Sequence, residues 1–294
     1  MTSKIDQLIS EIQSERKNPV LVLKEDEIGL STVYAMHDLL AQKSFDTLDV
    51  LLHTPGGDPD AAYKMARILK DHCKRANILV PAMAKSAGTL FSLCGDEVIL
   101  SELGELGPLD TQIEEHAEGG NRRFNSALNG FKALEQIKIH TLETMDLAAK
   151  MILLRSGMRI SECLSLAIQF SGQTSGTLYS KLDAQKIGEY ARALDIGEKY
   201  GVQILHRMCK WPIETAKKTV TQLVRGYPSH GYVLDYDELK SLGLNVSLIS
   251  HTLSETFVEI GKTFHMASGK IIKLADYSQS QNETVTPEEA TVEA

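Results

Sequence analysis

The chain has 294 residues, of which 43% are apolar and 24% charged, and it carries a formal net charge of −8. This balance excludes a collagen-like or wholly disordered chain, because its length and apolar content suffice for a large core without disulfides or metal ions. The acidic charge also argues against nucleic acid as a partner, since a polyanion is held by a basic surface.

The cysteines and the N-terminus both favour a cytoplasmic protein. The four cysteines lie far apart and form no C-x-x-C pair: Cys73, Cys94, Cys163 and Cys209. Such spacing favours reduced, buried thiols in a cytoplasmic protein, and suggests neither a metal site nor a cofactor. The N-terminus has no continuous apolar stretch, and no run of about 18 apolar residues occurs, so we expect no signal peptide and no membrane span.

The N-terminal half predicts one helix followed by alternating strands and helices. Residues 1–18 carry apolar side chains at helical spacing, which predicts an amphipathic helix: Ile5, Leu8, Ile9 and Ile12. Short apolar runs follow at residues 20–23, 48–53, 77–83 and 97–100. Helical patterns separate them at residues 30–41, after Asp58 and after Ser86. This alternation is typical of βαβ units, so we predict an α/β fold with a mostly parallel sheet.

The C-terminal half is predicted to be mainly helical. Residues 124–222 are rich in Ala, Leu, Lys and Glu, which indicates an added helical region. A short helix at residues 236–242 should end at Gly243 and lead into a last strand. Residues 276–294 are acidic and poor in large apolar side chains, so we predict a disordered tail. One domain would then span residues 19–275.

Two sharp turns lie at the C-terminal ends of predicted strands, where parallel sheets place their ligands. The first, HTPGGD at residues 53–58, puts paired glycines before a helix; the second, AKSAGT at residues 84–89, presents Ser86 between a strand and a helix. Taken singly, the first could be a tight connection and Ser86 an ordinary helix cap. Together, the N–H groups of Gly57 and Ala87 could hold one oxygen while the Ser86 hydroxyl attacks the carbon that carries it. The pair predicts an acyl-transfer site.

These turns also carry a resemblance to known proteins. HTPGGDPDAA and AMAKSAGTLFSLCGDEVILSELGELGPLD resemble the Clp protease and signal peptide peptidase superfamily with the Clp/crotonase fold, and more narrowly the serine dehydrogenase proteinase family. The resemblance implies a spiral of ββα units, a Ser86 nucleophile, an oxyanion hole from Gly57 and Ala87, and a trimer-based homo-oligomer. It also implies a substrate groove lined by Gly56, Gly107 and Asp110.

The base that activates Ser86 is left open by the sequence. The segment after the serine's helix lacks the histidine that Clp-type enzymes place there, so a Ser/Lys dyad, as in signal peptide peptidase relatives, becomes the favoured expectation. Lys132 is the first lysine of the following helical region, and Lys138 is the next. His116 and His230 are competing bases. Each of the four could instead be a solvated side chain.

The sequence therefore predicts an ATP-independent serine peptidase that hydrolyses peptides or unfolded protein segments through an acyl-enzyme on Ser86. Two alternatives stay open. An inactive peptide-binding or scaffold protein would fit the missing histidine, and a crotonase-type coenzyme A enzyme would share the fold without needing a serine at the second turn.

Overall fold

The computed structural model describes residues 4–110, 112–116 and 122–277, so nearly all of the predicted tail lies outside the described residues. The chain divides into two compact units. The first unit comprises Met1–Leu109 and Gly197–Ala294, and the second comprises Asp110–Ile196. The predicted helical region at residues 124–222 thus contributes to both units, and the predicted three-segment division of the chain stays a prediction.

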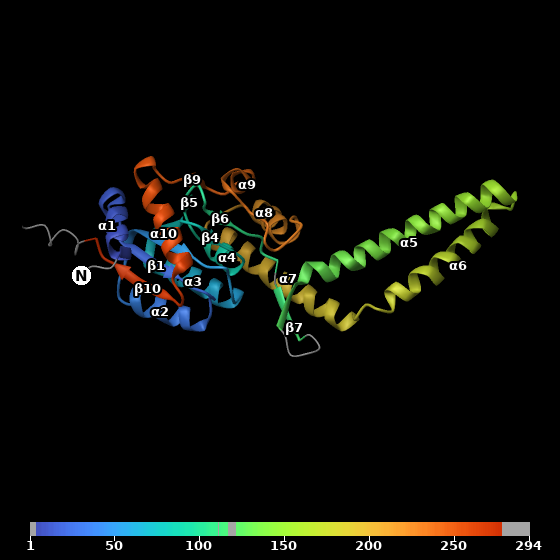
Figure 1. Ribbon diagram of the computed structural model, residues 1–294, viewed down its shortest axis with the longest axis horizontal. Coiled ribbons are helices and arrows are strands. Elements are labelled where there is room, and N and C mark those ends of the chain that lie inside the picture. The colour runs from blue at the N-terminus through green and yellow to red at the C-terminus, as the bar shows by residue number, and fades with distance from the viewer. Residues whose placement is uncertain (1–3, 111, 117–121, 278–294) are drawn as a thin grey trace, which may run out of the picture. The chain divides into compact units, whose positions relative to one another are not determined.

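A six-stranded sheet forms the centre of the first unit (Figure 1). Its strands lie in the order β10, β1, β2, β3, β5, β9, and only β10 runs antiparallel to its neighbour. The strands are β1 (Val20–Lys24), β2 (Phe45–His53), β3 (Cys73–Val80), β5 (Glu97–Leu100), β9 (Val246–Leu248) and β10 (Ile271–Ala275). The predicted α/β fold with a mostly parallel sheet is therefore confirmed.

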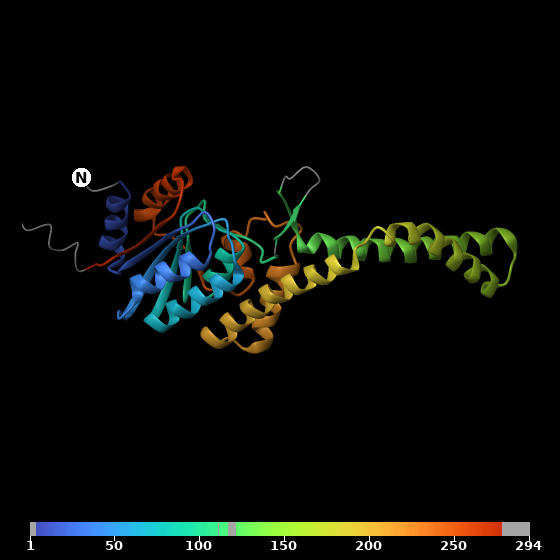
Figure 2. The same ribbon diagram turned by 90° about the horizontal axis from the view of Figure 1, so that it is seen from below.

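Helices cover both faces of this sheet (Figures 1 and 2). On one face, α1 (Lys4–Arg16) and α10 (Ser254–Met266) share a buried apolar cluster with β1, β2, β3 and β5. On the other face lie α2 (Leu30–Leu40) and α3 (Pro59–His72). The N-terminal helix docks on the sheet through a polar contact as well, because Arg16 Nε donates to the buried Asp49 carboxylate at 2.5 Å.

The apolar run at residues 77–83 is not a single strand, in contrast to the prediction. β3 ends at Val80, and β4 (Met83–Ala84) pairs in parallel with β6 (Glu105–Leu106) in a separate two-stranded sheet. Pro81 lies at the break, and proline has no backbone N–H to continue a ladder. β4 leads directly into the short helix α4 (Ala87–Ser92), so the break decides where the serine turn lies.

The C-terminal part of the first unit contains the predicted short helix and the strand after it, and in addition α10 and β10, which were not predicted. Its elements are the end of α7 (Ala184–Gln203), the π-helix η1 (Ile204–Met208), α8 (Ile213–Arg225), α9 (Tyr236–Ser241) and the 3-10 helix η2 (His251–Leu253). The short helix predicted at residues 236–242 is present as α9, and Gly243 follows it with a φ of 82°. Glycine adopts this left-handed conformation without the steric cost of a Cβ atom.

The second unit contains a β-hairpin and long helices. The hairpin strands are β7 (Gln112–His116) and β8 (Arg122–Ser126), and the helices are α5 (Ala127–Ser156), α6 (Ile160–Tyr179) and the first part of α7. The helical prediction from residue 124 onward is wrong at its start, since helix begins at Ala127. The hairpin residues are polar and charged, so they carry no apolar alternation that would indicate strands.

Candidate active site

The serine turn holds Ser86 in an unusual backbone conformation. Ser86 joins β4 to α4 with φ 50° and ψ −115°, a region that L-amino acids rarely adopt. Its hydroxyl makes no capping hydrogen bond to the helix, so Ser86 does not act as an ordinary side-chain cap. The N–H of Ala87, the first helical residue, belongs to the first turn, whose N–H groups have no partner within the helix.

The glycine turn is bonded to Ile28, a residue whose sequence context indicates no functional role. The Ile28 N–H donates to Gly56 O at 2.7 Å, and the Asp58 N–H donates to Ile28 O at 2.8 Å. In this parallel bridge Gly56 O and the Asp58 N–H both face Ile28. Because the N–H and the C=O of one peptide group point in opposite directions, the Gly57 N–H points away from Ile28. Gly56 and Gly57 have φ values of 129° and 143°, which disfavour any other residue.

The two turns are in direct contact through Thr54. The Thr54 N–H donates to Met83 O at 3.1 Å, and the Lys85 N–H donates to Thr54 O at 3.0 Å. The Thr54 hydroxyl oxygen accepts from the Gly56 N–H at 3.1 Å. A Cβ atom built on Gly56 would lie 2.8 Å from Ser86 Cβ and 3.4 Å from Ser86 Oγ. The glycine turn therefore lies against the nucleophile candidate itself.

Lys85 anchors the predicted substrate groove to the serine turn. Its buried ammonium pairs with Glu105 at 2.7 Å and donates to the carbonyl oxygens of Leu106 at 3.2 Å and Tyr232 at 3.3 Å. A Cβ atom on Gly107 would lie 2.6 Å from Lys85 Cδ, so the groove segment passes directly over this side chain. These contacts fix the Lys85 side chain between the serine turn and the segment that holds Leu106 and Gly107.

The segment that holds Gly107 is also bonded to Thr89 of α4. The Thr89 hydroxyl donates to Ala84 O at 2.8 Å and accepts from the Gly107 N–H at 3.0 Å. Asp110 is buried. The segment that holds Gly107 is thereby fixed to α4, which begins directly after Ser86.

The four candidate bases lie in different parts of the chain. Lys132 is half-buried and Lys138 is exposed, both on α5, and His116 is the last residue of β7; all three belong to the second unit. His230 belongs to the first unit and is half-buried in the turn before α9. That turn leads to Leu234, which forms a bridge with Leu106 of β6. The choice among the four stays a prediction.

His53, at the end of β2, is buried beside the glycine turn. Only 3% of the residue is exposed, its ring centroid lies 5.7 Å from that of Phe264, and its Nδ1 atom has no hydrogen-bond partner among the described residues. Burial, followed by the positive charges of Lys24 and His265, lowers the pKa of His53 from 6.5 to about 4.

This pKa predicts an acid-sensitive fold. Between pH 6.5 and pH 4 the unfolded chain binds a proton at His53 that the folded chain does not, so the free energy of unfolding should fall as the pH drops, by about 3 kcal/mol. In His53→Leu this part of the slope should be absent, while the exposed-histidine control His251→Leu should keep it. Urea unfolding at several pH values measures the slope, and an unchanged slope in His53→Leu would contradict the assignment.

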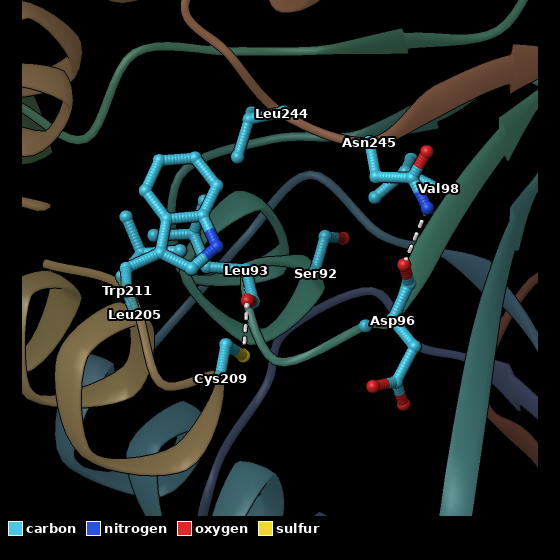
Figure 3. A pocket seen from close by; sticks show the side chains of 10 residues that line it. Ser92, Leu93, Asp96, Val98, Leu205, Cys209, Trp211, Leu244 and Asn245 are labelled. Atoms are coloured by element: carbon cyan, nitrogen blue, oxygen red, sulfur yellow. Dashed lines mark hydrogen bonds between the residues drawn. The ribbon is translucent and has the colours of Figure 1, made fainter. Parts of the chain in front are cut away.

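A separate cavity lies at the opposite edge of the sheet (Figure 3). It encloses about 110 Å³ and is lined by Ser92, Leu93, Gly95, Asp96, Val98, Leu205, Cys209, Trp211, Leu244 and Asn245. Asp96 and Asn245 directly precede β5 and β9, whereas the two turns follow the ends of β2 and β4. Its polar groups are used within the fold, since Cys209 Sγ donates to Leu93 O and Asn245 Nδ2 donates to Asp96 O.

The cysteines are free thiols, as their spacing predicts. All four thiols are free; Cys73, Cys94 and Cys163 are buried and Cys209 is half-buried. Burial raises the pKa of Cys73 to about 11. Among the described residues, no helix is long and apolar enough to cross a membrane, and no group of three or more His, Cys, Asp and Glu side chains is arranged to hold a metal ion.

Comparison with curated proteins finds two uncharacterized proteins of Methanocaldococcus jannaschii. MJ0137 is 25% identical over 253 residues, which cover 81% of this chain and 72% of that protein. MJ1495 is 25% identical over 201 residues, which cover 68% of this chain and 52% of that protein, so the chain spans about half of its length.

Among solved structures, the 1510-N membrane-bound stomatin-specific protease, solved as a mutant, is 17% identical with a TM-score of 0.32, over 50% of this chain and 68% of that one. The model of the family described as ClpP-like SDH-type serine proteinase matches residues 39–158. This range contains both the glycine turn and the serine turn, and the match supports a serine peptidase. Over residues 39–158 the chain thus matches the ClpP-like SDH-type serine proteinase family, and the resemblance predicted from the two turns is confirmed.

Proposed function

We propose that the chain is an ATP-independent serine peptidase that hydrolyses peptides or unfolded protein segments. Ser86 Oγ attacks the carbonyl carbon of the substrate, and the N–H groups of Gly57 and Ala87 donate to the oxygen that becomes negative. The observation that carries the proposal is the contact between the turns, in which Gly56 lies against Ser86 and Thr54 of the glycine turn bonds to Met83 and Lys85. The positive φ of Ser86 adds support, because strained nucleophile turns present the hydroxyl outward.

The reaction needs a base that takes the hydroxyl proton. In the proposed Ser/Lys dyad, the neutral amine of Lys132 accepts this proton and returns it to the leaving amine; Lys138, His116 and His230 are the alternatives. Water then attacks the acyl-enzyme and gives a proton to the same base, which passes it to Ser86 Oγ as the acyl–Oγ bond breaks and the carboxylate product leaves. We also propose a cytoplasmic homo-oligomer with a groove along Gly56, Gly107 and Asp110.

A fluorophosphonate probe tests the proposal without knowledge of the substrate. The folded protein should take up one adduct per chain, and fragment mass spectra should place it on Ser86 rather than on Ser92 or Ser101 of the same tryptic peptide. Heat-denatured protein is the control and should take up none. A folded protein that takes up no adduct would point to a peptide-binding scaffold, and tight coenzyme A binding in its place would point to a crotonase-type enzyme.

The same probe distinguishes the candidate bases. Lys132→Met should slow adduct formation by about 100-fold or more, the usual contribution of a general base, whereas Lys138→Met, His116→Gln and His230→Gln should react at nearly the wild-type rate. If one of these three is the slow variant, the base is reassigned to it while Ser86 stays the nucleophile. Normal rates in all four variants would contradict every candidate.

A further inference from the structure

The helices α5 and α6 pack against each other and carry an unusual amount of exposed apolar surface. We call residues 127–179 the arm. Thirteen of the 22 large apolar side chains that are exposed in the described residues belong to it, including Leu147 at 60%, Leu154 at 84% and Ile168 at 58%. Monomers rarely expose so many large apolar side chains on one pair of helices, and a high density of them is typical of an interaction surface.

The burial pattern along α6 shows that α5 covers only a narrow stripe of its surface. Small side chains at every fourth position are buried: Cys163, Ala167, Ser171 and Ser175. The Ser171 hydroxyl donates to Thr141 O of α5 at 2.7 Å, so this narrow stripe faces α5.

Exposed side chains lie on both sides of the buried stripe. With 3.6 residues per turn, the residues one position later lie about 100° away, and those three positions later lie about 60° away on the other side. The first row contains Leu164 and Ile168, and the second contains Leu166, Phe170 and Leu178, all of them exposed. The polar row of Ser165, Gln169, Gln173 and Thr177 faces away from the stripe. A helix with so wide an apolar face normally packs against more than one partner helix.

Two glycines in the first exposed row are required neither by the backbone conformation nor by the packing of a single copy of the chain. Gly172 and Gly176 lie inside α6, where each glycine costs about 1 kcal/mol of helix stability relative to alanine. A Cβ atom built on either one would meet nothing within 4 Å. Neither glycine is needed for a turn, since neither has a positive φ. Glycines four residues apart on a helix surface allow a second helix backbone to approach closely.

The charges of the arm distinguish between a membrane surface and a second copy of the arm as its binding partner. The arm contains five basic and four acidic residues, and no charged residue occurs from Cys163 to Ser180. An anionic membrane surface is bound by a strongly basic polar face, which the arm lacks. A second arm fits better, because two nearly neutral surfaces can meet without repulsion although the whole chain carries a net charge of −8.

We propose that the arm is a self-association surface: the arms of two copies of this chain pack into a four-helix bundle, with the α6 helices crossing at Gly172 and Gly176. A two-fold contact of this kind places the same surface on both copies. The exposed leucine and isoleucine side chains beside the α5–α6 seam then enter a shared core. This inference does not depend on the proposed peptidase activity.

Matched apolar-to-polar variants of the full chain test the surface. Leu147→Gln/Leu154→Gln changes two arm residues that are 60% and 84% exposed, and the control Leu248→Gln/Met266→Gln changes two first-unit residues that are 54% and 87% exposed. By sedimentation velocity, the wild type should show a larger particle mass than the arm variant at the same concentration. The dissociation constant of the arm variant should rise at least tenfold, and the control should match the wild type.

A second variant separates association from folding. Gly172→Leu/Gly176→Leu should hold or raise the melting temperature of the chain, because leucine favours helix and meets no neighbour within one copy. It should nevertheless weaken association at least tenfold, since the added side chains keep the α6 helices apart. Three results would overturn the proposal: a wild type of monomer mass at every concentration, arm variants with wild-type mass, or flotation of the wild type with phosphatidylserine vesicles that the arm variants lose.

Discussion

Ser86→Ala should lower the rate of hydrolysis of an unfolded protein, such as fluorescently labelled casein, by at least ~10⁴-fold. The backbone donors of Gly57 and Ala87 would remain, but no atom would be left to form the acyl-enzyme. The fold should persist, because the Ser86 hydroxyl caps no helix and alanine removes only that group. Circular dichroism of the variant checks this point.

The matched control for this variant lies on α4, the helix that begins directly after Ser86. Ser92 is buried and its hydroxyl donates to Gly88 O at 2.8 Å, so Ser92→Ala should cost about 1 kcal/mol of stability and leave the hydrolysis rate within about threefold of wild type. If the folded Ser86→Ala variant still hydrolyses the substrate at the wild-type rate, Ser86 does not form the acyl-enzyme.

Gly57→Ala should lower the hydrolysis rate by about 10³-fold, the cost of displacing one oxyanion donor, and should destabilise the fold by about 3 kcal/mol. The physical reason lies in the backbone. Gly57 has a φ of 143°, and a Cβ atom there would lie 2.2 Å from Ile28 O and 2.5 Å from Ile28 N. Ile28 cannot withdraw without losing its hydrogen bonds to Gly56 and Asp58, so the Gly57 N–H must move instead.

Gly29→Ala is the control for this substitution. Gly29 follows Ile28 directly, has an extended φ of −149°, and a Cβ atom built on it meets nothing within 4 Å. Its hydrolysis rate and its unfolding free energy should therefore stay close to wild type. Steady-state kinetics and urea unfolding measure both effects, and a fully active, stable Gly57→Ala would remove Gly57 from the oxyanion hole.

Much of the fold was predictable because it depends on local signals. Apolar runs of four to six residues became β1, β2 and β5, and Asp58 with Pro59 began α3 as a cap and first helical residue. The Asp58 carboxylate accepts from the Asp60 N–H at 2.8 Å, as a side-chain cap should. Such features require only neighbours in the chain.

The strands β6, β7, β8 and β10 were not predicted, and β8 and β10 show a common reason. β10 pairs antiparallel with β1, from which it is separated by about 250 residues, and its apolar run is too short to distinguish a strand from the end of a helix. β8 consists mainly of polar and charged residues, and its strand conformation comes from pairing with β7. Pairing partners distant in sequence or lacking an apolar pattern leave no local signal.

By itself, the sequence determined the parallel α/β layering, the serine and glycine turns at strand ends, and the helix capping, since each follows from side-chain chemistry within a few residues. Only the tertiary structure decided that Thr54 joins the two turns, that the Gly57 N–H points away from Ile28, and that Lys85 bonds to Glu105 and Leu106. These contacts link strands and loops that are distant in the chain, and hydrogen bonding across such distances depends on how the sheet is assembled.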